Sequence, residues 1–397
     1  MSTPAVRSGL DHLLSDTELL QRLRGKRLGL LVNPTSVTAD LTHAIEALQE
    51  AGLTLHLLFG PEHGVRADAQ DMEAVDETTD PISGLPCISL YGHTFESLKP
   101  RPEHLADLDL VLCDIQDVGS RYYTYVYSIG LMMDACGDAD VPVWVLDRPN
   151  PLGGLTLEGN IVDPSCRSFV GMQPLPNRHA LTPGELAHFF LRHGGWECDL
   201  EVVPLQGWRR SMWFDDTGLP WVMPSPNMPT LDTATVYPGQ CLLEGTNLSE
   251  GRGTTRPFEL FGAPFIDPMT VLAVLSEYEL PGLTLRPTAF RPTFQKHGGH
   301  TCRGFQTHIT DRDAYSSMAM SYALIAVLLR LYPDAFQWRE EAYEFVDDQL
   351  AIDLLFGHAS VRRDLEAGAH PLHLLESFQD QLRDFDDRRQ ACLLYHD

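Results

Sequence analysis

The sequence predicts an α/β fold, in which a Rossmann-like, doubly wound parallel sheet is followed by a second, smaller α/β domain. In the first half of the chain, apolar runs alternate with segments of helical periodicity, which is typical of a parallel sheet covered by helices on both faces. After about residue 235 the chain becomes rich in glycine, proline and polar residues, and 397 residues are too many for one ordinary core. We therefore predict domains at 1–235 and 236–397.

Five apolar runs are predicted as strands of the first sheet. They are short and end at glycine, proline or polar residues, as buried strands do. They lie at 27–34, 53–60, 85–92, 108–116 and 142–149. The first run continues into VNPTSV, which lacks the G-x-G-x-x-G turn of a dinucleotide site, and the sequence has no P-loop.

Helices are predicted between these strands. The segment 40–52 carries apolar residues at helical spacing, and Gly52 is placed to end the helix. The segment 122–137 has a second apolar helical face. Further along, Thr182 and Glu185 form a capping-box pattern around a proline suited to a first helical turn.

The second domain is less well defined by its sequence. Helical patterns are predicted at 311–331, 337–356 and 371–388. The strands of its sheet have no clear periodicity, so only the class of this smaller domain is predicted.

The composition excludes some classes of partner. The formal net charge of −26 repels phosphate backbones, so nucleic acid is not an expected partner. The sequence shows no signal-peptide pattern and no run of about 20 apolar residues, so we expect a cytoplasmic chain without membrane insertion. The eight cysteines include no C-x-x-C pair, which favours free thiols in a reducing compartment.

Polar side chains follow the predicted strands. The carboxyl ends of parallel strands share one edge of a sheet, where ligands bind, so we expect a cleft there that suits the hydroxyl groups of a sugar. The candidate residues are Asn33, Glu62, His63, Tyr91, Asp114, Gln116, Asp117, Arg121, Asp147, Arg148 and Asn150. The segment 147–151, whose two prolines fix the loop, is either part of this cleft or only a rigid turn.

Structural interpretations of the other candidates stay open as well. Glu62 can be a solvated loop residue or a helix cap, and His63 can be a structural histidine. Asp114 and Asp117 can instead brace Arg121 in an internal salt bridge.

The second domain adds a glycine-rich polar loop. Its glycines let the backbone approach a ligand closely, and it carries Glu244, Asn247, Glu250 and Arg252. Asn227 lies in a second rigid loop, SPNMP. Packing of the loops against the protein is the alternative interpretation of both.

No metal or other cofactor is predicted. His297 and His300 have ligand-like spacing, but no acidic third ligand lies near them in the sequence. No G-x-S-x-G elbow supports an esterase or amidase.

Taken together, the motifs resemble one family, the exo-β-N-acetylmuramidase NamZ-like family, first catalogued as a domain of unknown function. The resemblance runs in order from about Gly9 to Tyr395. The motifs that carry it are FGPEHG, SGLPCISLYG, DIQDVGSRYYTY, DRPNPLGG, PSPNMP, EGTNLSEGRGTTRPFELFGAP and DDRRQACLLY.

The resemblance implies a glycoside hydrolase that releases N-acetylmuramic acid from the non-reducing end of peptidoglycan fragments. It also implies that 1–235 is the catalytic domain and that 236–397 closes the active-site cleft. The glutamate of the P-E-H-G motif, Glu62, is the implied catalytic residue. The expected partner is therefore a small carbohydrate, and the oligomeric state stays open.

Glycosidic cleavage generally needs two carboxyl groups, one of which protonates the leaving oxygen. We expect Glu62 to be this acid, with His63 tuning it. The second group stays open among Asp114, Asp117, Glu244 and Glu250, and the substrate's own acetamide is a further alternative.

Recognition of the sugar needs other groups. Tyr122 or Tyr123 can stack on the sugar or hydrogen-bond to it. The lactyl carboxylate of muramic acid calls for a cation, for which Arg121, Arg148 and Arg252 are candidates.

The sequence departs from the family pattern at Ala67 and at Asp71 and Met72, where the family usually has glycine or an Ala-Gly pair. This loop follows Glu62, so substrate detail can differ. Two other functions stay open, namely a muropeptide- or sugar-binding protein without catalysis and another hydrolase of cell-wall fragments.

Overall fold

The computed structural model describes residues 5–66 and 78–397. The departures at Ala67, Asp71 and Met72 lie outside these residues. The predicted Rossmann-like sheet is confirmed: six parallel strands carry one short antiparallel strand at the edge, in the order β3-β4-β2-β1-β5-β6-β7. The strands are β1 (Leu28–Val32), β2 (Leu55–Gly60), β3 (Thr78–Thr79), β4 (Pro86–Ser89), β5 (Leu110–Asp114), β6 (Val143–Leu146) and β7 (Leu200–Val203).

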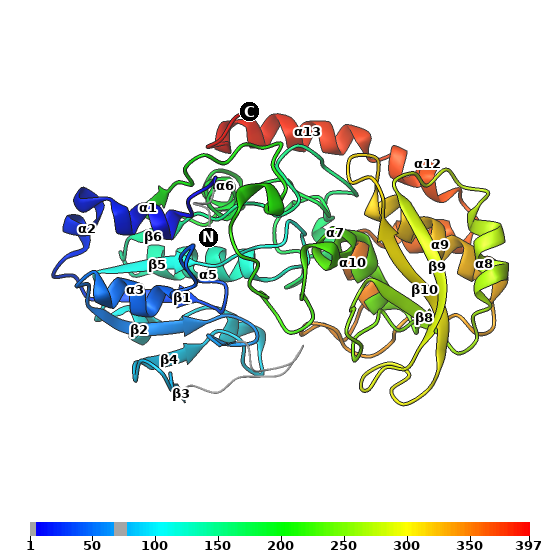
Figure 1. Ribbon diagram of the computed structural model, residues 1–397, viewed down its shortest axis with the longest axis horizontal. Helices are drawn as coiled ribbons and strands as arrows, with labels where there is room; N and C mark the ends of the chain where they lie inside the picture. The colour runs from blue at the N-terminus through cyan, green and yellow to red at the C-terminus, as the bar shows by residue number, and fades with distance from the viewer. Residues whose placement is uncertain (1–4, 67–77) are drawn as a thin grey trace.

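Both faces of this sheet are buried, which explains the continuous apolar runs. Leu30 of β1 belongs to a core cluster with α1 and α3, whereas its neighbour Leu31 belongs to a cluster with α5 and α6. Leu112 and Cys113 of β5 divide between the same two clusters. Helices therefore cover the sheet from both sides, as Figure 1 shows.

The helices of this first unit are short apart from α5. Thr182 and Glu185 form the predicted capping box at the start of α6, with both reciprocal hydrogen bonds present. The helices are α1 (Gly9–Ser15), α2 (Thr17–Leu23), α3 (Ala44–Glu50), η1 (Phe95–Leu98), α4 (Pro102–Leu105), α5 (Tyr125–Asp138), η2 (Pro164–Cys166), α6 (Pro183–Phe189), η3 (Phe190–Gly194) and η4 (Phe214–Thr217).

The second unit contains a three-stranded antiparallel sheet in the order β8-β10-β9. Helices α7, α8 and α12 pack against its long helix α9. Its elements are α7 (Leu231–Gln240), η5 (Cys241–Gly245), β8 (Leu260–Ala263), α8 (Pro268–Leu275), β9 (Leu283–Phe290), β10 (Cys302–Ile309), α9 (Ser317–Leu331), α10 (Ala351–Phe356), α11 (Ala359–Glu366), α12 (Pro371–Glu376), α13 (Gln379–Arg389) and η6 (Gln390–Cys392).

The end of the chain returns to the first unit. In Figure 1, α13 runs back from the second unit toward α6, and the C-terminus lies above the first sheet. Phe385 of α13 packs on Phe189 of α6, and Tyr395 joins a small core cluster with Val6, Leu205 and Trp208. The boundary predicted between 235 and 236 stays a prediction.

The helix predicted at 337–356 is wrong over most of its length. Only α10, its last part, is helical, and residues 337–350 are irregular. Their backbone pairs with the glycine-rich loop: Asn247 N donates to Gln337 O at 2.9 Å, and Arg339 N donates to Gly245 O at 2.9 Å. Hydrogen bonds to a distant segment thus replace those of a helix.

Within the described part of the chain, no helix combines the length and the apolar character that crossing a bilayer requires.

Candidate functional site

A hollow lies between the two units and gathers acidic and aromatic side chains together with the amide of Asn227. Loops that follow β2 and β5 form one side, and the second unit forms the other. Its charged or titratable lining residues are Glu62, His63, Glu244, Arg252 and Glu344, and its phenols are Tyr122, Tyr123, Tyr125, Tyr237 and Tyr343.

Glu62 lies in the tight turn that follows β2. The side chain is buried, with 6% of the residue exposed, and its Oε2 accepts a hydrogen bond of 2.9 Å from Thr124 Oγ1. Thr124 is the residue before α5, so the carboxyl group lies at the start of that helix. His63 follows with a φ of 68°, a left-handed conformation that is uncommon without glycine and that is often found at functional sites.

Glu244 and Arg252 face the hollow as an ion pair from the second unit. Arg252 Nη2 donates to Glu244 Oε1 at 2.8 Å, and Tyr343 Oη donates to Glu244 Oε2 at 2.8 Å. Burial alone raises the pKa of Glu244, but Arg252, Tyr343 and Lys296 outweigh it and lower this pKa below its usual value. The carboxylate therefore stays ionised and holds the guanidinium in place.

Glu344 reaches the hollow from the segment predicted to be helical. It is buried, with 4% of the residue exposed, and its Oε2 accepts a hydrogen bond of 3.1 Å from Tyr91 Oη. Sequence reasoning missed Glu344 and Tyr343, because the helix predicted over 337–356 gave no sign that they face a cavity. It also missed Tyr237, which no sequence signal placed at a cavity.

The phenols around the hollow stay neutral. Burial raises the pKa values of Tyr122, Tyr123, Tyr237 and Tyr343 well above their usual value. Tyr122 Oη donates to Pro238 O at 2.6 Å, which fixes this ring in the wall. Neutral, fixed rings can stack on a sugar or hydrogen-bond to it.

Asn227 offers a polar donor in the SPNMP loop. It lines the hollow, and its buried Nδ2 has no hydrogen-bond partner among the described residues. A buried amide without a partner is costly, so this donor suits a ligand that supplies an acceptor.

Other predicted candidates are used inside the first unit. Arg148 donates from Nε and Nη2 to the two oxygens of Asp114, at 2.5 and 2.8 Å. Asp117 accepts from Gly119 N at 2.7 Å and pairs with His179. The two aspartates therefore do not brace Arg121, and neither they nor Arg148 line the hollow.

Arg121 was expected to bind the lactyl carboxylate, but its side chain is used inside the protein. It is fully buried, and its Nη1 and Nη2 donate to four backbone carbonyls. The acceptors are Asn160, Leu175, Leu355 and Phe356. The guanidinium therefore links backbone carbonyls of the first unit to those at the end of α10.

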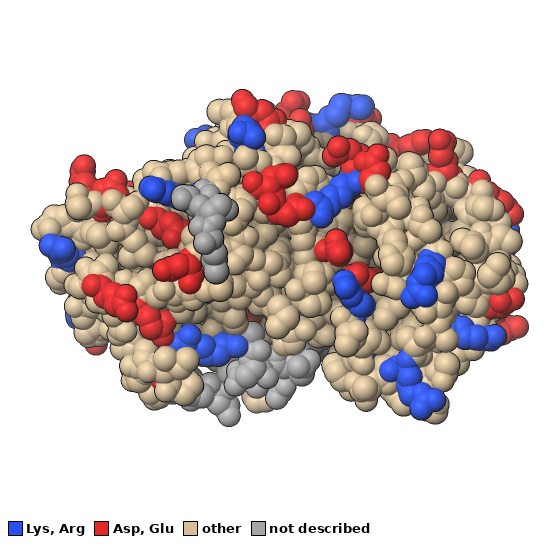
Figure 2. Space-filling view, viewed as in Figure 1, with Lys and Arg blue, Asp and Glu red and all other residues tan. Residues whose placement is uncertain are grey.

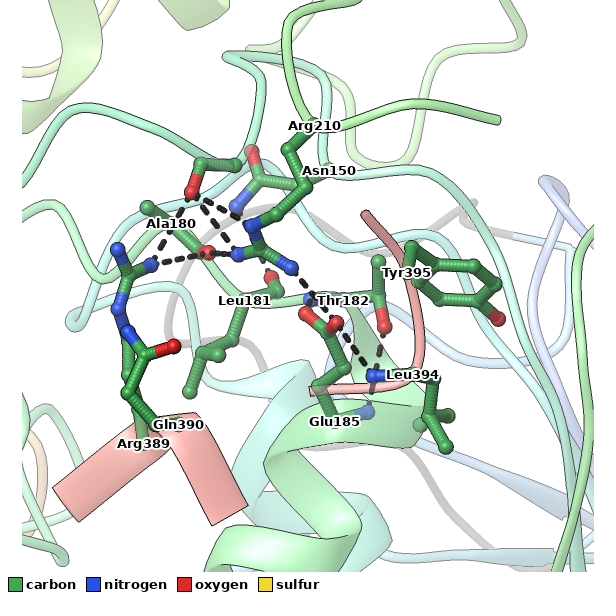
Figure 3. A network of polar contacts seen from close by, with 12 residues as sticks. Asn150, Ala180, Leu181, Thr182, Glu185, Arg210, Arg389, Gln390, Leu394 and Tyr395 are labelled. Carbon is green, nitrogen blue, oxygen red and sulfur yellow. Dashed lines mark hydrogen bonds and ion pairs between the residues drawn. The ribbon is translucent and has the colours of Figure 1, made fainter. Parts of the chain in front are cut away.

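Amide and acid candidates near the strand ends also make internal contacts. Asn33 Oδ1 accepts from Thr35 N at 3.0 Å, and Gln116 Nε2 donates to Pro149 O at 2.7 Å. Asn150 Nδ2 donates to Leu181 O at 2.9 Å, a contact visible in Figure 3. The edge of the sheet at β1, β5 and β6 is thus filled by the protein itself, which corrects the expectation that all five strand ends open into one cleft.

Asp147 is another candidate whose side chain is used for contacts within the protein. Asp147 is enclosed in contacts with Thr182, Gly184 and Tyr395. Figure 3 shows the adjoining network, in which Glu185 pairs with Arg210, and Arg210 and Arg389 both donate to Ala180 O. This network anchors the end of the chain to α6.

Two residues of the glycine-rich loop lie outside the hollow as well. Asn247 binds Gln337 N and Ala335 O, which fixes the loop. Glu250 pairs with Arg252 and Lys296 at 3.4 and 3.0 Å, so it helps to hold Arg252 in place without lining the hollow itself.

Comparisons with known proteins agree with this architecture. Residues 28–232 match the family model for the N-terminal domain of the exo-beta-N-acetylmuramidase NamZ, and residues 235–395 match that for its C-terminal domain. Over 393 residues the chain is 43% identical to the peptidoglycan beta-N-acetylmuramidase NamZ of Bacillus subtilis (strain 168), covering 99% of this chain and 92% of that protein.

Solved structures are similar over the same length. A DUF1343 family protein from Bacteroides fragilis NCTC 9343 superposes with a TM-score of 0.89 at 33% identity and covers 99% of this chain and 100% of its own. A second DUF1343 protein from the same source has a TM-score of 0.75 at 27% identity, with 99% of each chain covered.

Proposed function

Because the chain belongs to the exo-beta-N-acetylmuramidase NamZ family, we propose that it is an exo-acting glycoside hydrolase that releases N-acetylmuramic acid from the non-reducing end of peptidoglycan fragments. The observation that carries this proposal is the hollow between the two units, in which the glutamate of the P-E-H-G motif lies among phenols and the amide of Asn227. The second unit closes one side of this hollow, as an exo-acting enzyme requires.

We propose that Glu62 is the general acid. Thr124 fixes its Oε2, which leaves Oε1 as the atom that delivers the proton to the glycosidic oxygen. The bond between C1 of the muramyl residue and that oxygen then breaks, and the leaving sugar departs with the proton. His63, the next residue in the turn, also lines the hollow, and we propose that it tunes Glu62.

Arg252 is the proposed partner of the lactyl carboxylate. Among the described residues it is the guanidinium that lines the hollow, and Glu244 and Glu250 hold it from two sides. A planar guanidinium can bind a carboxylate through two parallel hydrogen bonds.

Recycling of cell-wall fragments in the cytoplasm is the proposed setting. None of the eight cysteines, all of which lie in the described part of the chain, forms a disulfide, and six of them are buried. Free thiols are typical of a reducing compartment, which supports this setting.

Replacing Glu62 by Gln tests the proposal, with a chromogenic β-muramyl glycoside as the substrate. The variant keeps a hydrogen-bonding side chain of the same size but loses the acid, so we expect the rate to fall by about 10²-fold or more. Glu259→Gln is the matched control, because Glu259 is also buried but binds Thr233 and Arg256 away from the hollow. Near-full activity of Glu62→Gln, or binding of the glycoside by the unchanged protein without turnover, contradicts the proposal.

A further inference from the structure

We propose that Glu344 is the second carboxyl group of the reaction, the group that assists attack at C1. The inference rests on the proposed function, because it concerns the same hollow. Glu344 lines this hollow together with Glu62, and the two residues come from different units of the protein. Glycosidic cleavage generally uses two carboxyl groups placed around one sugar.

The backbone presents Glu344 in an unusual conformation. Tyr343 and Val346 bond to each other through both backbone groups, at 2.9 and 3.0 Å, which makes Glu344 and Phe345 the two central residues of a tight turn. Their φ values are 47° and 67°, in the left-handed region that turns of this kind usually fill with glycine or asparagine. Two bulky residues there cost backbone strain, and such strain is found where a side chain must point in a fixed direction.

Contacts across the two units hold this turn in place. The ring of Phe345 packs on Tyr91 and Phe95 of the first unit, with centroids 5.6 and 6.2 Å apart, and on Phe169 at 6.3 Å. The phenol of Tyr91 donates directly to the Glu344 carboxyl group. The first unit therefore orients a carboxyl group that the second unit supplies.

Glu244, the other acid of the second unit in this hollow, is suited to a different task. It accepts hydrogen bonds at both oxygens, from Arg252 and from Tyr343, and the guanidinium balances its charge. Its geometry fits a residue that positions Arg252. Glu344 receives its orienting hydrogen bond across the two units from the phenol of Tyr91, which fits a residue that is aimed at the sugar.

The proposed step conserves atoms and protons. Water attacks C1 as the glycosidic bond breaks and its oxygen bonds to C1. One proton of that water stays on the new hydroxyl group, and Glu344 accepts the other. Glu62 gives its proton to the leaving sugar oxygen. One water is consumed, and both carboxyl groups return to their initial states when the proton on Glu344 passes to solvent and Glu62 takes one up.

The test uses the full-length chain and a β-muramyl glycoside with a good leaving group. We expect Glu344→Gln and Glu344→Ala to lose about 10²-fold or more in kcat. Glu341→Gln is the matched control, because Glu341 lies on the same segment but its side chain is 81% exposed, and we expect it to keep the full rate. Thermal unfolding and binding of N-acetylmuramic acid establish that each variant is folded.

Azide separates a chemical role of Glu344 from a structural one. Azide is an anion that needs no base to attack C1, so it should restore turnover to Glu344→Ala and yield muramyl azide. Retained activity of Glu344→Ala overturns the proposal, and so does a folded, sugar-binding variant that azide does not rescue. Formation of muramyl azide by Glu62→Ala instead also overturns it. The unchanged chain failing to cleave the glycoside is a different result, which refutes the proposed function itself.

Discussion

Asp147 is a buried acid at the end of β6 that accepts hydrogen bonds from several directions. Its partners are Thr182 Oγ1 at 2.8 Å, Gly184 N at 2.7 Å and the phenol of Tyr395. Burial outweighs these hydrogen bonds and raises the pKa of Asp147 to about 7. The sequence marked this residue as a possible sugar ligand, but its contacts join the first unit to the end of the chain.

The raised pKa of Asp147 predicts a pH dependence of stability. The folded state binds this proton more tightly than the unfolded state does. The free energy of unfolding should therefore fall as the pH rises from about 4 to about 7, by at most roughly 1.4 kcal/mol per pH unit from this residue. Asp147→Asn cannot ionise and should remove this part of the slope. Urea unfolding at a series of pH values measures it, with the exposed Asp348→Asn as control. Equal slopes in all three proteins contradict the prediction.

At the scale of elements, Gly357 shows how the end of a helix fixes a side chain of the other unit. It follows α10 with a φ of 70°, and a Cβ at this position would lie 2.7 Å from Arg121 Nη2. The same guanidinium nitrogen donates to Leu355 O and Phe356 O, the last carbonyls of α10. The left-handed glycine thus leaves room for the cation that binds the end of the helix.

Gly357→Ala is therefore expected to destabilise the protein by about 1–3 kcal/mol, through backbone strain and collision with Arg121. Gly368→Ala is the matched control, because Gly368 has a φ of 84° and a Cβ added to it would meet nothing within 4 Å. Denaturant unfolding of both variants separates strain from collision. Equal losses would show that Arg121 adds nothing at Gly357.

The elements also show what the sequence can predict. The strands were predictable because burial on both faces makes each a continuous apolar run, as in β1 and β5. The segment 337–350 was not, because its backbone partners lie about 90 residues earlier, near Asn247. Glu344 was hidden by this error, since its φ and its contact with Tyr91 depend on packing between the units.

At the scale of the whole molecule, the same limit applies to the site. Glu62, Asn227, Glu244 and Arg252 were predicted and do line the hollow. The sequence could not distinguish Arg121 from these four residues, because a polar residue after a strand can equally well bind backbone carbonyls of the other unit. Which polar residues face a ligand is decided by how the two units pack, and a local pattern does not contain that information.

The charge of the whole molecule opposes its proposed substrate. The net charge is −26, and acidic side chains are spread over the face seen in Figure 2. Three carboxyl groups and one guanidinium line the described hollow. A muramyl substrate carries its own carboxylate, so the long-range field of the protein repels it, while Arg252 attracts it only at short range.

Salt should therefore speed the reaction. Ions screen repulsion between distant charges more than they weaken a contact inside a buried hollow, so we expect kcat/KM for a muramyl glycoside to rise severalfold between about 20 and about 200 mM salt. The same glycoside with its lactyl carboxylate converted to an amide is the control and should respond little. Arg252→Lys should lower kcat/KM for the charged glycoside but keep the sign of its salt dependence, because the distant charges are unchanged. A fall of kcat/KM with salt would mean that local attraction by Arg252 controls binding and that the acidic surface does not.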